Sequence, residues 1–325
     1  MSKISNDTYR YYLRNIVRKI GLENAPSVFG AEKKCYIFKN FVIFVQSIPN
    51  GLQDTEQFEN TISTKLLKQQ NLQYLSNCGI QVAKILDIQL SEDKVFEIQE
   101  KAPGEVLFYT NESNILNLFG DKEMKREHTS FKDMGEPYRV EFCEKLIQRN
   151  LDMQKKLKNA PLSQFVKFLA DFKALEEYGM DLDLHGENFL YSPKEGFTFI
   201  DLPNGQSSEQ KRFSKDSILE SQLEFEDRKI KSIEKYRDAP HSKILYDACK
   251  LFADSLKYAG HVHDLSLIAK IKKNNTTLIE KLFAASKLAG YKITDTEYNK
   301  LWQLCSSFCH EVPVGSSQST EHTIN

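Results

Sequence analysis

The sequence predicts an α+β fold of two lobes, in which a small β-rich N-lobe precedes a larger, mainly helical C-lobe. The chain has 325 residues, which is more than one small hydrophobic core usually needs. Apolar runs of strand length dominate the first hundred residues, and helically spaced apolar residues dominate after Pro103-Gly104. The expected units are an N-lobe over 1–101, a C-lobe over 102–312 and a disordered tail over 313–325.

The N-lobe pattern begins with a short helix that we expect within residues 1–25. A run of β-branched and aromatic residues follows, KCYIFKNFVIFVQSI at 34–48, with a plausible tight turn at Lys39-Asn40, so it predicts two strands of a hairpin. The segment 55–77 predicts a helix. Its expected apolar face consists of Phe58, Ile62 and Leu66.

Two further strands are expected in GIQVAKILDIQL at 79–90 and KVFEIQEKA at 94–102. The N-lobe should therefore contain two strands, a helix and two more strands. In the C-lobe, apolar residues at helical spacing predict helices over about 140–158 and 162–178. The region 215–311 is also helical by pattern.

Charge and hydropathy give no support to two classes of partner. The net charge is −1 and the sequence pI is about 6.7, which gives no electrostatic case for nucleic acid or an anionic membrane. No apolar run approaches the roughly 20 residues that span a bilayer, and the N-terminus lacks an apolar signal core. We therefore expect a cytoplasmic protein with no nucleic-acid or membrane partner, and the oligomeric state stays open.

The six cysteines are scattered and form no CxxC pair, which is typical of reduced thiols in a cytoplasmic protein. Cys305 and Cys309 share a helix face at i, i+4, with His310 adjacent. A metal site there would need further ligands, so packing is the favoured interpretation.

Candidate functional residues gather in DLDLHGENFL at 181–190. Asp183 and Asn188 stand in a loop after a predicted helix, and FLY then indicates a strand. The turn SPKEG leads to FTFID, so Asp201 ends a second strand and a hairpin would bring it near Asn188. One amide oxygen and one carboxylate form part of a suitable shell for Mg²⁺. Asp183 could accept a hydroxyl proton or orient the attacking group.

These motifs resemble those of a known superfamily. DLHGEN at 183–188 is similar to the catalytic loop of the protein-kinase-like superfamily, closest to the aminoglycoside and choline phosphotransferase branch. The step from Asp183 to Asp201 resembles the one that separates its catalytic and metal-binding aspartates, and FIDL at 199–202 resembles the short ID motif of small-molecule kinases. The resemblance implies a two-lobe protein-kinase-like fold, ATP and Mg²⁺ as cofactors, Asp183 as catalytic residue, and Asn188 and Asp201 as metal ligands.

Two further segments agree with the resemblance. GIQVAKIL at 79–86 resembles the strand after the regulatory helix, and FEIQEKAPGEVL at 96–107 resembles the hinge between the lobes. By this match, the backbone of Glu100 and Ala102 would meet an adenine ring.

The phosphate-binding part departs from the pattern. The resemblance places a lysine at the end of the second hairpin strand, where this chain has Gln46. Gln46 can donate hydrogen bonds to phosphate but carries no charge. Lys39 is the alternative if the strand registration differs, or another lysine reaches in. The partner on the helix would be Glu56 or Glu59.

The function predicted from these residues is ATP- and Mg²⁺-dependent transfer of the γ-phosphoryl group to a hydroxyl of a small molecule. A small acceptor is favoured because no long activation segment with an APE-like end follows the ID motif. The alternatives are a protein kinase that acts on a partner protein, and a catalytically inactive kinase-like nucleotide-binding module with Gln46 as its signature. Nucleotidyl transfer to protein is a further alternative.

Overall fold

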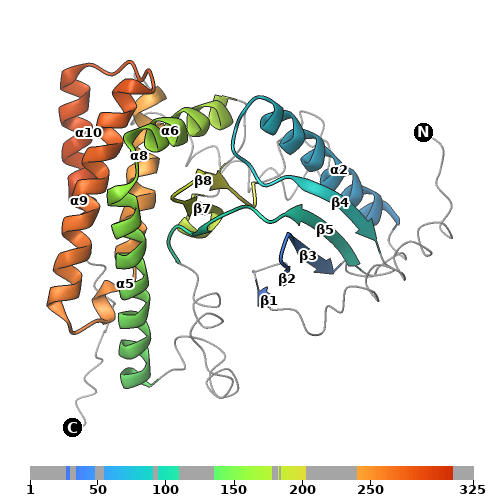
Figure 1. The fold of residues 1–325 in the computed structure, drawn as a ribbon, viewed down its shortest axis with the longest axis horizontal. Helices are drawn as coiled ribbons and strands as arrows, with labels where there is room; N and C mark the ends of the chain where they lie inside the picture. The colour runs from blue at the N-terminus through green and yellow to red at the C-terminus, as the bar shows by residue number, and fades with distance from the viewer. Residues whose placement is uncertain are drawn as a thin grey trace, which may run out of the picture.

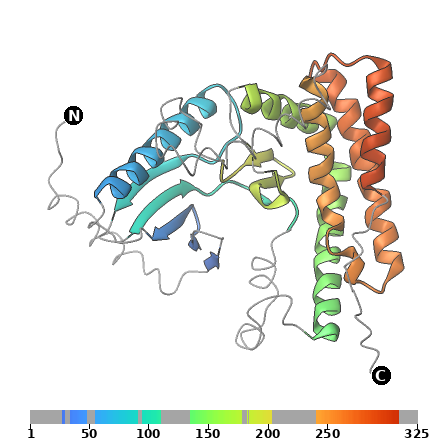
Figure 2. The same cartoon turned by 180° about the vertical axis from the view of Figure 1, so that it is seen from behind.

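The computed structural model describes residues 27–29, 34–47, 55–90, 94–109, 135–177, 182, 184–202 and 240–309. Figure 1 shows a small antiparallel sheet with one helix, α2, on one side of the hairpin β7–β8, and the long helices on the other side. The view from behind in Figure 2 shows the same separation into two lobes. The expected α+β class, with a small β-rich N-lobe and a larger helical C-lobe, is confirmed.

The N-lobe sheet has five strands in the order β1-β2-β3-β5-β4, and all neighbouring pairs are antiparallel. The hairpin expected at 34–48 is confirmed, because β2 pairs with β3 across the turn at Lys39-Asn40. The helix and the later strand β5 also form where the sequence predicts them, whereas the strand expected over 79–90 begins only at Ile85. The bounds are β1 Ser27–Phe29, β2 Lys34–Ile37, β3 Phe41–Ser47, α2 Thr55–Asn77, β4 Ile85–Leu90 and β5 Lys94–Glu100. The short helix that we expected within residues 1–25 lies outside the described residues.

The buried face of α2 differs from the apolar face that the sequence predicts. Leu66 is 46% exposed, although Ile62 packs against the sheet. The side chain of Phe58 lies outside the described residues. The residues that are buried follow the helical repeat: Lys65, Lys68, Leu72 and Leu75. The prediction for Leu66 was wrong because two lysines occupy the inward positions, where acidic partners meet their ammonium groups.

The C-lobe combines five described helices with a small three-stranded sheet, β6-β7-β8. Helices expected over 140–158 and 162–178 are confirmed as α5 and α6, and three helices lie within the described part of 215–311. The bounds are α5 Glu136–Asn159, α6 Leu162–Glu177, α8 Pro240–Ala253, α9 Leu265–Leu288, α10 Asp295–Phe308, β6 Glu105–Val106, β7 Phe189–Ser192 and β8 Gly196–Phe199. Short 3₁₀ turns are η4 Gly186–Asn188, η6 Asp254–Leu256 and η7 Ala259–His261.

A cluster of aromatic rings forms the centre of the C-lobe core between α6, α8 and the hairpin β7–β8. Phe168 contacts rings from both hairpin strands, with centroids 5.8 Å from Phe189 and 5.7 Å from Phe199. Cys305 and Cys309 are buried free thiols in this core, which agrees with the packing interpretation. The aromatic cluster therefore holds the hairpin rigidly against the helices.

The segment after α2 ties the N-lobe to the hairpin. The Phe199 N–H donates to the Gln81 carbonyl at 2.9 Å, and the Ala83 N–H donates to the Phe199 carbonyl at 3.1 Å. The Gln81 N–H also donates to a carboxylate oxygen of Asp171 in α6 at 3.3 Å. The segment after α2 and the strand β8 are thus fixed to each other by backbone hydrogen bonds.

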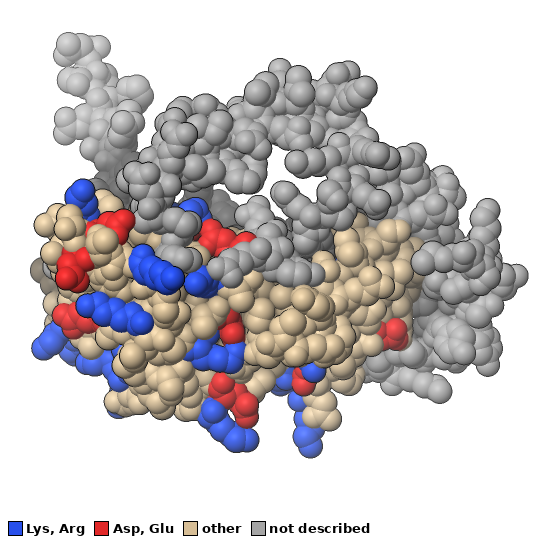
Figure 3. All heavy atoms as spheres, turned by 90° about the horizontal axis from the view of Figure 1, so that it is seen from above, with Lys and Arg blue, Asp and Glu red and all other residues tan. Residues whose placement is uncertain are grey.

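The described surface carries charges of both signs. On the face drawn in Figure 3, lysines, arginines and acidic residues are interspersed, without a broad field of one sign. Among the described helices, none is long and apolar enough to cross a membrane. The lobe boundary between 101 and 102 stays a prediction, and the expected tail over 313–325 lies outside the described residues.

Candidate active site

The hairpin β7–β8 brings Asn188 and Asp201 to the same end. Asn188 closes the turn η4, directly before β7, and Asp201 follows β8 by two residues. Phe189 lies opposite Phe199, and the Ile200 N–H donates to the Asn188 carbonyl at 2.9 Å. The backbone of the two polar residues is therefore held together, with the adjacent phenylalanines buried in the C-lobe core.

The loop before β7 passes close to the C-lobe backbone. A Cβ at Gly186 would lie 2.4 Å from the Phe108 carbonyl oxygen, so only glycine fits without a shift of the chain. The Phe108 N–H donates to the Gly186 carbonyl at 3.2 Å, and the half-buried Leu182 and Leu184 pack against the core. Asp183, the expected catalytic residue, lies outside the described residues.

Asp201 adopts a backbone conformation that is unusual for a residue with a side chain. Its φ is 48°, in the left-handed region, which costs such residues roughly 1–2 kcal/mol. Its side chain is 43% exposed, although the neighbouring strand is buried. Strained backbone of this kind clusters at functional sites. The local fold thus holds this carboxylate at the end of the hairpin, open to solvent.

The carboxylate of Asp201 also acts on the N-lobe sheet. Cys35 in β2 has its pKa raised to about 12 by burial and, secondarily, by the negative charge of Asp201. The Cys35 thiol therefore stays protonated at neutral pH.

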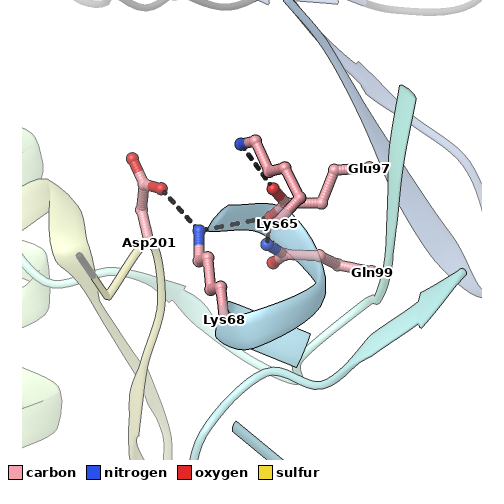
Figure 4. Close-up of polar contacts among 5 residues, drawn as sticks. All are labelled: Lys65, Lys68, Glu97, Gln99 and Asp201. Atoms are coloured by element: carbon pink, nitrogen blue, oxygen red, sulfur yellow. Dashed lines mark hydrogen bonds and ion pairs between the residues drawn. The ribbon is translucent and has the colours of Figure 1, made fainter. Parts of the chain in front are cut away.

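Five polar residues from both lobes form what we call the charged cluster, drawn in Figure 4: Lys65, Lys68, Glu97, Gln99 and Asp201. The Lys65 ammonium lies 2.7 Å from Glu97 Oε2, and the Lys68 ammonium lies 3.2 Å from Glu97 Oε1. Lys68 also reaches Asp201 Oδ1 at 3.4 Å. The Gln99 amide donates to Glu97 Oε1. Helix α2, strand β5 and the end of β8 each contribute to this cluster.

The charges within the cluster are unevenly buried. The side chains of Lys65 and Lys68 are 6% and 3% exposed, and that of Glu97 is 2% exposed. Removing charges from water is costly unless opposite charges and hydrogen bonds compensate for the lost hydration. The enclosed part holds two ammonium groups and one carboxylate, so the partly exposed Asp201 supplies the remaining negative charge.

Gln46, the expected phosphate-binding residue, lies near this cluster but on another strand. Gln46 is opposite Val95 in the β3–β5 register, and Phe44 is opposite Glu97. Residues two apart on a strand share a face, so Gln46 and Glu97 lie on the same face of the sheet. One pair of opposite residues, Val45 and Phe96, separates them along the strands. The alternative Lys39 is exposed in the turn before β3. The side chains of Glu56 and Glu59 lie outside the described residues.

Glu100 and Ala102, expected to meet adenine, lie where β5 ends and the chain crosses to the C-lobe. The Glu100 N–H donates to the Lys84 carbonyl at 2.9 Å. Gly104 follows with φ 111°, and a Cβ there would lie 2.5 Å from the Tyr191 carbonyl oxygen. The crossing segment is therefore pressed onto β7, close to the hairpin that carries Asn188.

Asp254 in η6 is a C-lobe carboxyl whose pKa is shifted. Its pKa is raised from 3.8 to about 6 by burial, and the positive charges of Lys250 and Lys257 oppose this rise.

The sequence reading missed Lys65, Lys68 and Glu97 as site residues. One signal was available: Lys65 and Lys68 fall in helical register with Leu72 and Leu75, which face the core. A second was the alternation of Glu97 and Gln99 with apolar residues in β5. Neither signal shows which polar group meets which, because the pairing depends on the contact of α2 with β5 across the fold.

No protein-family model matches the chain, and no curated protein matches it. Among solved structures, it is similar to the bifunctional kinase-methyltransferase WbdD, at 14% identity and TM-score 0.30, covering 84% of this chain and 47% of that one. The chain thus spans about half the length of WbdD. It is also similar to the aminoglycoside phosphotransferase APH(3'')-Id from Streptomyces rimosus, at 12% identity and TM-score 0.36, covering 94% and 99%.

A third similar structure is Rad53 1-466 in complex with AMP-PNP, at 11% identity and TM-score 0.32, covering 95% of this chain and 67% of that one. The first two of these structures are described as a kinase-methyltransferase and an aminoglycoside phosphotransferase. At such TM-scores they add no argument about function. The fold assignment rests on the order and pairing of the chain's own strands and helices.

Proposed function

We propose that the chain is an ATP- and Mg²⁺-dependent phosphotransferase that moves the γ-phosphoryl group to a hydroxyl of a small molecule. The observation that carries the proposal is the end of the hairpin β7–β8. There Asn188 and Asp201 lie together, and the Lys68 ammonium lies 3.4 Å from Asp201 Oδ1. A carboxylate with a buried cation beside it, next to an asparagine whose backbone is held at the same end of the hairpin, is suited to a metal-bound polyphosphate.

The donor set fits Mg²⁺. Among the described residues, no three His, Cys, Asp or Glu side chains gather as a metal site. Mg²⁺ does not require such a protein cage, because it keeps waters and takes phosphate oxygens as ligands. The Asn188 amide oxygen and the exposed Asp201 carboxylate would hold it, and the ion would neutralise charge on the phosphates.

The other expected residues have defined roles in the proposal. Asp183 accepts the proton of the acceptor hydroxyl while the hydroxyl oxygen bonds to the γ-phosphorus of ATP. The bond between that phosphorus and the oxygen that bridges it to the β-phosphorus breaks, and ADP leaves. The backbone of Glu100 and Ala102 binds adenine. Gln46 donates hydrogen bonds toward the phosphates. The protein's contribution is mainly positioning and neutralisation of charge.

One observation favours a second candidate, the catalytically inactive nucleotide-binding module. Strand β3 reads FVIFVQS and has no lysine or arginine, so the strand that should supply the phosphate-binding cation supplies none. An inactive module would bind nucleotide without transfer.

The first experiment is calorimetric titration of ATP, with and without Mg²⁺, into the wild type, Asp201→Ala and Asp152→Ala. Asp152 is an exposed aspartate on α5, which makes it a matched control. We expect Mg²⁺-dependent binding in the wild type and control, and a sharp fall in Asp201→Ala. Absence of ATP binding in all three would refute the proposal.

Transfer is then measured with γ-labelled ATP against small hydroxyl metabolites and against a panel of proteins. Asp183→Ala is the inactive control. Label in a small molecule supports the proposal, and label only in proteins supports the protein-kinase alternative. Nucleotide binding without any transfer supports the inactive module.

A further inference from the structure

The buried cations of the N-lobe come from helix α2, whereas the resemblance places the phosphate-binding lysine on strand β3. Lys65 and Lys68 are almost fully buried, with side chains 6% and 3% exposed. Lysine is rarely buried to this extent unless it is paired. Two buried lysines one helical turn apart therefore place positive charge beneath the sheet, where acidic groups must pair with it.

The acidic partner of the lysine also lies on a different element from the one that the resemblance implies. An acid on α2, Glu56 or Glu59, was expected to pair with a strand lysine. In the structure, Glu97 on β5 receives the lysines of α2, and β5 is the strand paired with β3. The helix–strand ion pair is thus present with its charges exchanged, the cation on the helix and the carboxylate on the sheet.

The two lysines have different roles within this arrangement. Lys65 lies 2.7 Å from Glu97 Oε2, and this short contact directs it to the sheet. Lys68 is shared, at 3.2 Å from Glu97 Oε1 and 3.4 Å from Asp201 Oδ1. Figure 4 shows the Lys68 ammonium between the two carboxylates. Lys68 is therefore the cation directed at the end of the hairpin, where Asp201 is partly open to solvent.

The fold fixes the distance between Lys68 and the hairpin. Downstream of Lys68, α2 buries Leu72 and Leu75 in the same core cluster as Phe199. The segment after the helix then pairs with β8, through the hydrogen bonds of Gln81 and Ala83 with Phe199. A cation on α2 is thus positioned against Asp201 by direct contacts, without relying on β3.

We propose that Lys68 is the phosphate-binding cation of this chain, and that it contacts the polyphosphate of a nucleoside triphosphate held at Asp201. Lys65 is a positioning residue, because its contact with Glu97 Oε2 offsets part of the charge of the carboxylate that Lys68 also contacts. This inference rests on the proposed function and names the residue that replaces the lysine missing at Gln46.

The test compares Mg²⁺·ATP with adenosine, which has the same base and ribose but no phosphate. Both are titrated into the wild type, Lys68→Met, Lys65→Met and Lys155→Met, an exposed lysine of α5 that serves as control. We expect Lys68→Met to weaken ATP binding about 10- to 100-fold, as for loss of a charged hydrogen bond, and to leave adenosine binding unchanged. Lys65→Met should weaken ATP binding less, and Lys155→Met should not weaken it.

The outcomes separate the inference from the proposed function. Equal loss of ATP and adenosine binding in Lys68→Met would mean that Lys68 only shapes the fold, and unchanged ATP binding would mean that it does not reach the phosphates. Either result overturns the inference while wild-type ATP binding still supports the function. A wild type that binds neither ligand overturns both. Thermal unfolding checks that Lys68→Met is folded, and Lys68→Gln is titrated in its place if it is not.

Discussion

The two lobes each contain a buried polar network, and the networks differ in charge and in access to solvent. In the C-lobe, a neutral network joins α5, η6 and α9: Asn150, Gln154, Ser255 and Asn275. The Gln154 amide donates to Ser255 Oγ at 3.4 Å and to the Ile271 carbonyl at 3.3 Å. All members of this neutral network are at most 2% exposed.

The charged cluster contrasts with this neutral network on both counts. Three of its buried members, Lys65, Lys68 and Glu97, carry full charges, and one member, Asp201, is 43% exposed. Neutral amides and hydroxyls can satisfy one another inside a core and fix how helices pack. Buried ions cost several kcal/mol each, and their retention needs a reason beyond packing. Burial of polar residues alone therefore does not indicate a candidate site, whereas buried charge beside a partly exposed carboxylate does.

The largest effect on stability should come from removing the buried carboxylate. Glu97→Gln leaves the ammonium groups of Lys65 and Lys68 without their common enclosed partner. We expect a loss of about 3–5 kcal/mol in the free energy of unfolding, as when one partner of a buried ion pair is deleted. Urea denaturation measures it directly.

The matched control is Glu141→Gln, which neutralises an acid that is 58% exposed and pairs with Lys145 on the surface of α5. We expect a change within about 0.5 kcal/mol there. Equal losses in the two variants would contradict the description of the charged cluster as an enclosed ion pair.

The neutral network gives the next largest effect, and it should be confined to stability. Gln154→Met keeps the volume of the side chain but removes the amide, so the Ile271 carbonyl loses this buried donor. We expect a loss of about 2–3 kcal/mol in the free energy of unfolding, with unchanged affinity for Mg²⁺·ATP. Urea denaturation and calorimetric titration test the two halves. A weakened nucleotide affinity in the folded variant would remove the distinction between the two networks.

Much of the fold was accessible from the sequence because it depends on local pattern. The strands at 34–48, the helix at 55–77 and the hairpin that ends near Asp201 each have strong periodicity and turn residues, and each is confirmed. Strand β1 was not predicted, since its three residues are too few to show a pattern. Strand β6 is shorter still.

The charged cluster could not be predicted, because its chemistry depends on contacts between segments far apart in the chain. Leu66 was predicted to face inward on α2, and no inward role was predicted for Lys68. Glu97 reverses that order by giving the lysine ammonium groups a buried partner on β5. The sequence could indicate that a lysine was missing at Gln46, but not which element replaced it.

Asp254 directly precedes Ser255 of the neutral network and is a titratable carboxyl beside it. Burial raises its pKa from 3.8 to about 6, so the folded state favours the protonated carboxyl. Its stabilising contribution is therefore full below about pH 4 and is lost as the pH rises through about 6. Asp254→Asn should lack this loss.

The measurement is the difference in unfolding free energy between the wild type and Asp254→Asn across pH 4 to 7. We expect the unfolding free energy of the wild type to fall, relative to that of Asp254→Asn, by on the order of 2 kcal/mol as the pH rises. This figure allows for solvent screening. A difference that does not vary with pH would show that Asp254 is ionised as readily in the folded protein as in the unfolded chain.

The smallest effect should come from an exposed ion pair that matches the buried one in distance. The Lys156 ammonium lies 2.8 Å from Glu105, close to the 2.7 Å between Lys65 and Glu97, but the Lys156 and Glu105 side chains are 39% and 54% exposed. Because water and salt already screen these charges, Lys156→Gln should cost less than about 0.5 kcal/mol in unfolding free energy, and less still in high salt. Urea denaturation at two ionic strengths tests this. A loss as large as that of Glu97→Gln would mean that distance, and not burial, sets the strength of ion pairs in this protein. Burial would then no longer distinguish the charged cluster from surface ion pairs.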